Sequence, residues 1–223
     1  MHLRATLAFA ALATLASGCA TTRAPEAVEF AVPPQIVIQQ AVGHAASLVG
    51  EAEVLVEGER FAASSTGLVA AAYAAGGLRL QPGVIGGTPA PKEIWALMAG
   101  RGRGVDLAAV AAGDVLFFDN TFDANGNGVR DDLLTQVGLV ESVSIDGTIS
   151  FFYYAQGSVS EAVVTPTEPS RRLDPTIGAE LNTVLRLRAD GGPRLAGQLL
   201  VGAARPLGAM PNAGGSAAMA SVD

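Results

Sequence analysis

Several residue types that commonly carry chemistry or cross-links are scarce in this chain of 223 residues. Cys19 is its only cysteine, so no disulfide can form within the chain. Lys92 is the only lysine, and His44 is the only histidine after His2. Arginine and lysine together number 14 against 21 acidic residues, which gives a formal charge of −7. This balance excludes the basic footprint of a nucleic-acid-binding protein.

Apolar residues, by contrast, are plentiful. They make up 49% of the chain, whereas charged residues make up 16%. This composition predicts one sizeable folded domain and argues against a wholly disordered protein. Because aromatic residues are only 5%, we expect a core built mainly from small side chains.

The N-terminus has the pattern of a targeting segment. Residues 1–18 contain a short polar start and an apolar run, and small residues then precede Cys19. This pattern resembles a bacterial lipoprotein signal, which implies lipidation of Cys19 and a place in the cell envelope, at the outer membrane facing the periplasm. An ordinary cleaved secretory signal is the alternative, and both place the protein outside the cytoplasm. No later stretch is long and apolar enough to span a bilayer, so attachment to the membrane would be through lipid alone.

The remaining chain divides into three parts. Residues 19–34 are expected to form a tether, residues 35–205 the folded domain, and residues 206–223 a disordered tail. Apolar spacing predicts helices over 35–49, from about 64 to Gly76 or Gly77, and from Pro91 to Gly100, with a short one over 195–201.

Short β-rich runs dominate the second half of the chain. A hairpin is expected over 54–61, followed by strands over 114–118, 136–140, 149–154, 159–164 and 181–187. Helices followed by strands predict an α+β domain with an antiparallel sheet.

Three motifs occur in a fixed order: Ser64-Ser65-Thr66-Gly67-Leu68-Val69, then Gly113-Asp114-Val115-Leu116-Phe117-Phe118, then Gln136-Val137-Gly138-Leu139-Val140. Together they resemble the NlpC-type cell-wall peptidases, papain-like enzymes that cut the stem peptides of peptidoglycan. The resemblance covers about residues 35–165 and implies a papain-like fold with helices packed on an antiparallel sheet.

The resemblance also implies where a catalytic site would lie. The family's cysteine falls on Ser65, its acidic neighbour on Ser64, its histidine on Gln136 and its third polar residue on or near Tyr154. Serine needs an adjacent base to act as a nucleophile, and a glutamine amide is not a base near neutral pH. We therefore expect a degenerate, inactive site in a module that binds peptidoglycan or a cell-wall enzyme.

Two alternatives stay open. Ser65 could serve as the nucleophile of an active hydrolase, amidase or acyltransferase with a base that the sequence does not identify. The chain could instead be an unrelated β-rich lipoprotein stabilised by calcium.

The segment between the second and third motifs predicts a calcium loop. Oxygen-bearing side chains and a central glycine have the spacing of the start of an EF-hand loop. The expected ligands are Asp123, Asn125, Asn127, the carbonyl of Val129, Asp131 and Asp132. Leu134 stands where a bidentate glutamate is usual, with Asp132 as a substitute, so binding should be weak, at about 10⁻⁴ to 10⁻³ M. A solvated hairpin turn without metal is the alternative.

Overall fold

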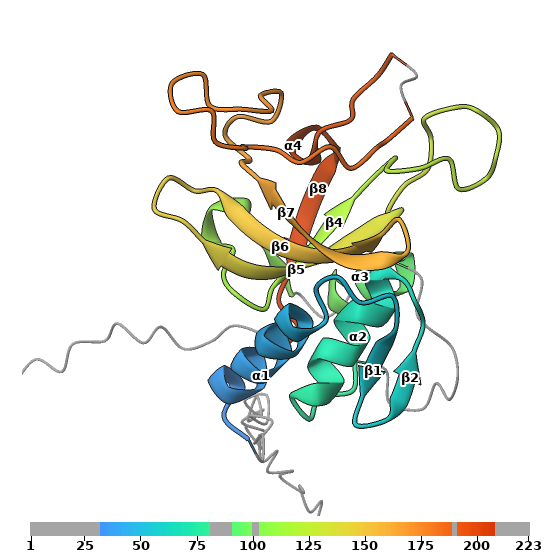
Figure 1. The fold of residues 1–223 in the computed structure, drawn as a ribbon, viewed down its shortest axis with the longest axis vertical. Helices are drawn as coiled ribbons and strands as arrows, with labels where there is room; N and C mark the ends of the chain where they lie inside the picture. Colours follow the sequence, from blue (N-terminus) through green and yellow to red (C-terminus); the bar gives the residue numbers. More distant parts are fainter. Residues whose placement is uncertain (1–31, 81–90, 100–102, 189–190, 208–223) are drawn as a thin grey trace, which may run out of the picture. The chain divides into compact units, whose positions relative to one another are not determined.

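The computed structural model describes residues 32–80, 91–99, 103–188 and 191–207 (Figure 1). The signal segment, Cys19 and most of both the tether and the tail lie outside the described residues, and their predictions are not tested. Within the described residues, no helix combines the length and apolar composition that crossing a bilayer requires.

The domain is α+β, as the sequence predicted, and is built on an antiparallel sheet. Six strands are ordered β3-β8-β4-β5-β6-β7, with every neighbouring pair antiparallel. Their bounds are β3 Gly104–Val105, β4 Val115–Phe118, β5 Gln136–Val143, β6 Ile149–Ala155, β7 Ser158–Val164 and β8 Leu200–Ala204.

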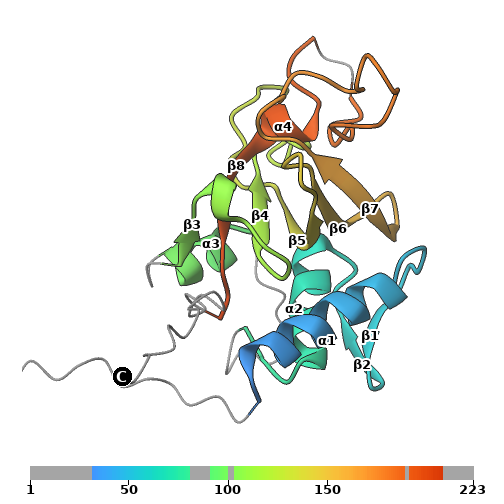
Figure 2. The same ribbon diagram turned by 90° about the vertical axis from the view of Figure 1, so that its left-hand side faces the viewer.

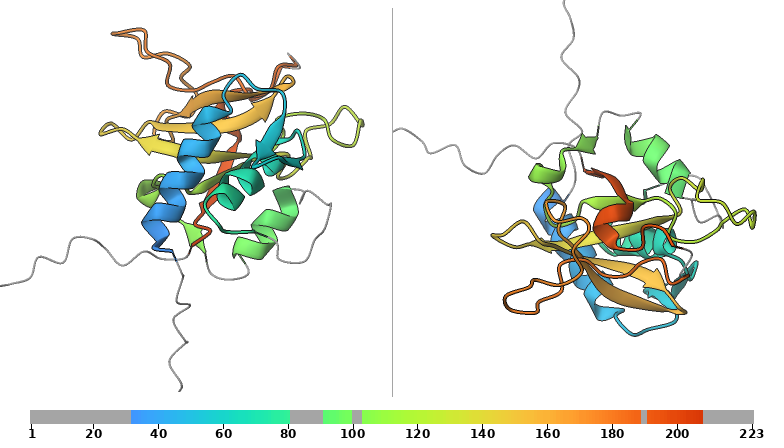
Figure 3. Two further views of the ribbon diagram at one scale, coloured as in Figure 1. Left: turned by 60° about the horizontal axis from the view of Figure 1, so that its bottom comes forward. Right: turned by 90° about the horizontal axis from the view of Figure 1, so that it is seen from above.

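Helices cover one face of this sheet. Helix α2 (Ser65–Ala75) packs on β5 and β6, and α1 (Pro34–Ser47) packs on α2 and β5 (Figure 1). A hairpin of β1 (Val54–Val56) and β2 (Glu59–Phe61) flanks α2 on its other side, and α3 (Pro91–Ala99) contacts β8 (Figure 3). The three predicted helices and the hairpin are therefore confirmed, with ends that differ by a few residues.

The opposite face is covered by loops and by α4 (Ala196–Leu199) (Figure 2). Its core joins Phe118 and Phe151, whose rings stack with centroids 5.3 Å apart, to Leu116, Val164 and Leu199. All four residues of β4 are buried, as expected for a central strand with both faces covered.

One sequence prediction of secondary structure is wrong. Residues 181–187 form no strand; only isolated bridges pair Asn182 with Val164 and Val184 with Leu195. The short helix predicted over 195–201 is confirmed as α4, although it is a single turn and β8 begins directly after it. The sequence also gave no indication of β3 or of the short 3₁₀ helix Leu107–Ala109.

A buried ion pair joins the start of β4 to the end of β8. Asp114 is 1% exposed, and its two carboxylate oxygens each accept a hydrogen bond of 2.8 Å from Arg205. Asp114 also accepts from the N–H of Ala111, while Arg205 donates to the carbonyl of Ala109. The hydrogen bond to Asp114 raises the pKa of Arg205, which keeps its guanidinium charged.

Replacing Arg205 by methionine should destabilise the domain, because the Asp114 carboxylate would stay buried without its partner. We expect a loss of about 3 kcal/mol in the free energy of unfolding, measured by urea denaturation. The control is Arg60→Ala, which breaks an exposed pair with Glu53 and should cost less than about 1 kcal/mol. Equal effects of the two substitutions would contradict the structural role of the buried pair.

Candidate functional site

A cavity of about 630 Å³ opens beside the first turn of α2. Its wall is shared by this turn, the adjoining ends of β5 and β6, the loop between β4 and β5, and the segment that precedes α4. The polar residues that line it are Ser64, Ser65, Thr66, Thr121, Asp123, Thr135, Gln136, Tyr154, Gln156, Arg186 and Arg188. Its apolar lining is Ala63, Pro91, Phe122, Ala155, Leu185 and Leu187.

The first turn of α2 is fixed by its N-cap and by a glycine. The Ser64 hydroxyl accepts a hydrogen bond of 3.1 Å from the N–H of Gly67, as a helix N-cap does. A Cβ added at Gly67 would stand 2.0 Å from the carbonyl oxygen of Ala62. Only glycine therefore lets the incoming chain pass this close to the helix, which holds Ser65 against the sheet.

The structure brings Ser65 and Gln136 together, as their positions in the resemblance implied. Gln136 Nε2 lies 3.2 Å from Ser65 Oγ and 3.3 Å from the carbonyl oxygen of Tyr154. Ser65 Oγ also lies 3.0 Å from that carbonyl oxygen and 3.2 Å from the N–H of Tyr154. Ser65 and Gln136 are each only 8% exposed.

The hydrogen atoms of this cluster can be assigned from its chemistry. A carbonyl oxygen only accepts, so the Ser65 hydroxyl donates to Tyr154, and the same carbonyl requires the NH₂ end of the Gln136 amide beside it. The N–H of Tyr154 and Gln136 Nε2 only donate, and both point at Ser65 Oγ. The hydroxyl therefore donates once and accepts twice, which is its full capacity.

Tyr154 joins this cluster through its backbone. Its phenolic hydroxyl donates to the carbonyl of Ala52, 3.0 Å away in the segment before β1. The backbone of Tyr154 thus bonds to Ser65, and its ring hydroxyl bonds to the segment before β1. The ring hydroxyl forms no hydrogen bond with Gln136.

Charged groups are few in the cavity. Among the described residues that line it, the only charged ones are Asp123, Arg186 and Arg188, and none is a histidine, lysine or cysteine. His44 lies on α1, outside this lining. The described surroundings of Ser65 thus contain no side chain of the kinds that usually activate serine.

Sequence reasoning missed the two arginines. Arg186 is 1% exposed and donates to the carbonyl of Asn120, 2.7 Å away, whereas Leu187 beside it is 56% exposed. This reverses the expected placement of charged and apolar side chains. The β-rich run over 181–187 predicted a strand and gave no signal for a cavity wall.

The loop between β4 and β5 is braced where it leaves the sheet. Asn120 and Asp132 exchange hydrogen bonds, the N–H of Asn120 to the Asp132 carbonyl and the N–H of Asp132 to Asn120 Oδ1. Leu134 has the left-handed φ of +52° and donates its N–H to Asp119. These bonds offset the strain at Leu134 and hold Thr121 and Thr135 in the cavity wall.

The predicted calcium ligands share one hydrogen-bonded loop. Asp123 accepts from the N–H groups of Gly126 and Gly128, and the side-chain oxygens of Asn125 and Asn127 accept from backbone N–H groups two residues further on. The amide nitrogens of both asparagines donate to Asp131. Asp132 is buried and accepts from the N–H of Ala124, while Val129 donates to Asn127.

This oxygen-rich donor set suits a hard cation. The described residues contain no group of three His, Cys, Asp or Glu side chains placed to hold a metal. Two of the expected ligands are asparagines, which are not among these four residue types. Calcium binding therefore stays a prediction.

Comparisons of the chain with protein-family models, with curated proteins and with solved structures found no match.

Replacing Ser65 by alanine should destabilise the domain, because the N–H of Tyr154 would lose its acceptor and Gln136 Nε2 would lose one of its two acceptors. We expect a loss of about 1 to 3 kcal/mol in the free energy of unfolding, measured by urea denaturation. The control, Ser47→Ala, removes an exposed hydroxyl that bonds only to its own helix and should change stability by less than about 0.5 kcal/mol. Unchanged stability of Ser65→Ala would contradict a structural role for this hydroxyl.

Calcium should raise the melting temperature if the loop between β4 and β5 binds it. At about 10 mM calcium and a Kd of about 10⁻³ to 10⁻⁴ M, the expected stabilisation is roughly 1.4 to 2.7 kcal/mol. Asp123→Asn should remove it, whereas Asp146→Asn, in the hairpin between β5 and β6, should not. No calorimetric heat and no shift in melting temperature would rule out the metal site.

Proposed function

We propose that this protein is an envelope lipoprotein whose NlpC-type, papain-like domain has lost catalysis and binds peptidoglycan through the cavity beside α2. The observation that carries the proposal is the Ser65 hydroxyl, whose one hydrogen and both lone pairs are engaged by Tyr154 and Gln136. A nucleophile needs a free lone pair and a base to take its proton, and this hydroxyl has neither among its partners.

The family resemblance is supported by the spatial meeting of its motifs. The motif at the start of α2 and the motif at the start of β5 lie 71 residues apart in sequence, yet Ser65 and Gln136 are hydrogen-bonded. A helix that presents a residue to the first positions of a neighbouring antiparallel strand is the arrangement that the resemblance implies. The neutral side chains of Ser65 and Gln136 take the positions of the family's ionisable cysteine and histidine.

The cavity itself supports binding. Its volume of about 630 Å³ falls in the range of small-molecule sites, about 300 to 1,000 Å³. Hydroxyl and amide groups line it together with the exposed side chains of Phe122 and Leu187. A peptide segment can contact both the polar and the apolar parts of this lining, since it has a polar backbone and can carry apolar side chains.

Binding is tested by sedimentation of the mature protein with insoluble peptidoglycan. We expect retention, with Phe122→Ala weakening affinity by about tenfold because an apolar contact is lost. Ile177→Ala is the control, since Ile177 is exposed but does not line the cavity. Failure to bind would contradict the proposal and would favour a cell-wall enzyme as the partner.

The same preparations test catalysis. We expect no release of soluble peptide fragments by the protein. Release that disappears in Ser65→Ala would overturn the inactive assignment and support the hydrolase alternative.

A further inference from the structure

We propose that the cavity recognises the C-terminal end of a peptide with a free carboxylate, which Arg188 binds at the cavity mouth. This inference rests on the proposed function and names the chemical group that the cavity selects. It rests on two groups that line the same cavity: a hydrogen-bond donor, the guanidinium of Arg188, and a hydrogen-bond acceptor, the side-chain oxygen of Gln136. Neither group forms a hydrogen bond with a described residue.

The first group is the guanidinium of Arg188. Its side chain is 66% exposed, and it makes no hydrogen bond with the described residues. Its only ion pair there is with Asp123, at 3.8 Å between Nη1 and Oδ2, which is beyond hydrogen-bond distance. The Asp123 carboxylate is instead engaged by the N–H groups of Gly126 and Gly128. The planar fork of N–H donors on Arg188 is therefore available for a carboxylate.

The second group is the carbonyl oxygen of the Gln136 amide. Its Nε2 atom is held by Ser65 and Tyr154, which fixes the orientation of the amide. No described residue donates a hydrogen bond to Oε1, and Gln136 lines the cavity. A ligand that covers this oxygen must therefore supply an N–H donor to it, since an acceptor that becomes buried without a partner is costly.

The charge balance of the lining agrees with an anionic ligand. Among the described residues that line the cavity, the two arginines Arg186 and Arg188 outnumber the one acidic residue, Asp123, although the whole chain carries −7. Arg186 is buried and donates to the carbonyl of Asn120, so the exposed Arg188 is the arginine that a ligand can reach.

The C-terminal residues of a peptide carry this combination of groups. Their carboxylate matches Arg188, an amide N–H further inward matches Gln136, and small side chains match the apolar wall at Ala63, Ala155 and Leu185. An amidated or cross-linked end lacks the carboxylate. The cavity should therefore prefer peptide stems whose ends are free.

The test uses the mature chain and two synthetic stem tetrapeptides ending in D-alanine, one a free acid and the other its C-terminal carboxamide. Calorimetry should show the free acid binding about tenfold more tightly than the carboxamide. Arg188→Gln should lower the affinity for the free acid to that for the carboxamide. About 1 M salt should also reduce the preference, because Arg188 is exposed and its charge is easily screened.

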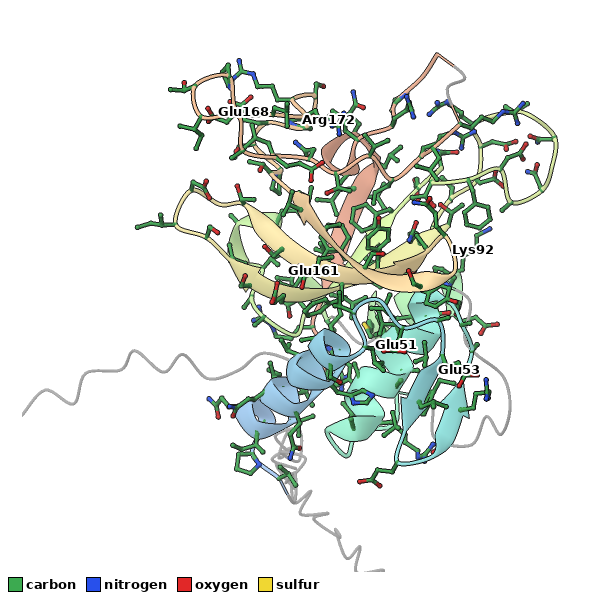
Figure 4. The ribbon with its side chains drawn as sticks, in the orientation of Figure 1. Glu51, Glu53, Lys92, Glu161, Glu168 and Arg172 are labelled. Carbon is green, nitrogen blue, oxygen red and sulfur yellow. The ribbon has the colours of Figure 1, made fainter. Side chains whose placement is uncertain are left out.

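Arg172→Gln is the matched control. Arg172 is as exposed as Arg188 but lies on the loop after β7, is paired with Glu180 and does not line the cavity (Figure 4). This variant should keep the preference for the free acid. Unchanged melting temperatures of both variants confirm that they are folded.

Three outcomes separate the two proposals. Preference for the free acid that Arg188→Gln abolishes and Arg172→Gln retains supports the inference. Equal binding of the two peptides, or a preference that survives Arg188→Gln, overturns it and leaves the binding function standing. No binding of either peptide overturns the inference together with peptide binding by the cavity.

Discussion

The hydroxyl of Ser65 is the point at which helix and sheet are joined. It donates to the carbonyl of Tyr154 and accepts from Tyr154 and Gln136, so one atom links the start of α2 to both β5 and β6. The approach depends on Gly67, where any side chain would collide with Ala62. The floor of the cavity exists because these contacts leave the first turn of α2 facing the strand ends.

A cluster of this kind favours rigidity over reactivity. Serine and glutamine are neutral at all ordinary pH values, so burying them requires only hydrogen bonds and no compensating charge. A charged nucleophile and base at the same positions would have to stay reactive and hence incompletely bonded. The neutral pair explains how Ser65 can be fully hydrogen-bonded while Gln136 Oε1 accepts no hydrogen bond from the described residues.

The elements that sequence predicted well are those with strong local signals. Pro34 and Pro91 begin α1 and α3, Ser64 caps α2, and runs such as Val115–Phe118 have the composition of buried strands. The strand predicted over 181–187 is not formed. Its β-rich composition indicated a strand, but hydrogen bonds from the side chains of Asn182 and Arg194 to backbone carbonyls hold the segment instead. The strand that completes the sheet, β8, is short and rich in alanine and glycine, so its local signal was weak.

The sequence by itself determined the α+β class, the central helix with its capped first turn, and the positions of Ser65 and Gln136 in ordered motifs, because each depends on residues close together along the chain. Only the tertiary structure decided that Ser65 is fully hydrogen-bonded, that Arg186 is buried and that Arg188 and Gln136 line one cavity. These facts arise where segments far apart in sequence meet. Periodicity and composition report which face of an element is apolar, and they do not report what a side chain contacts across that face.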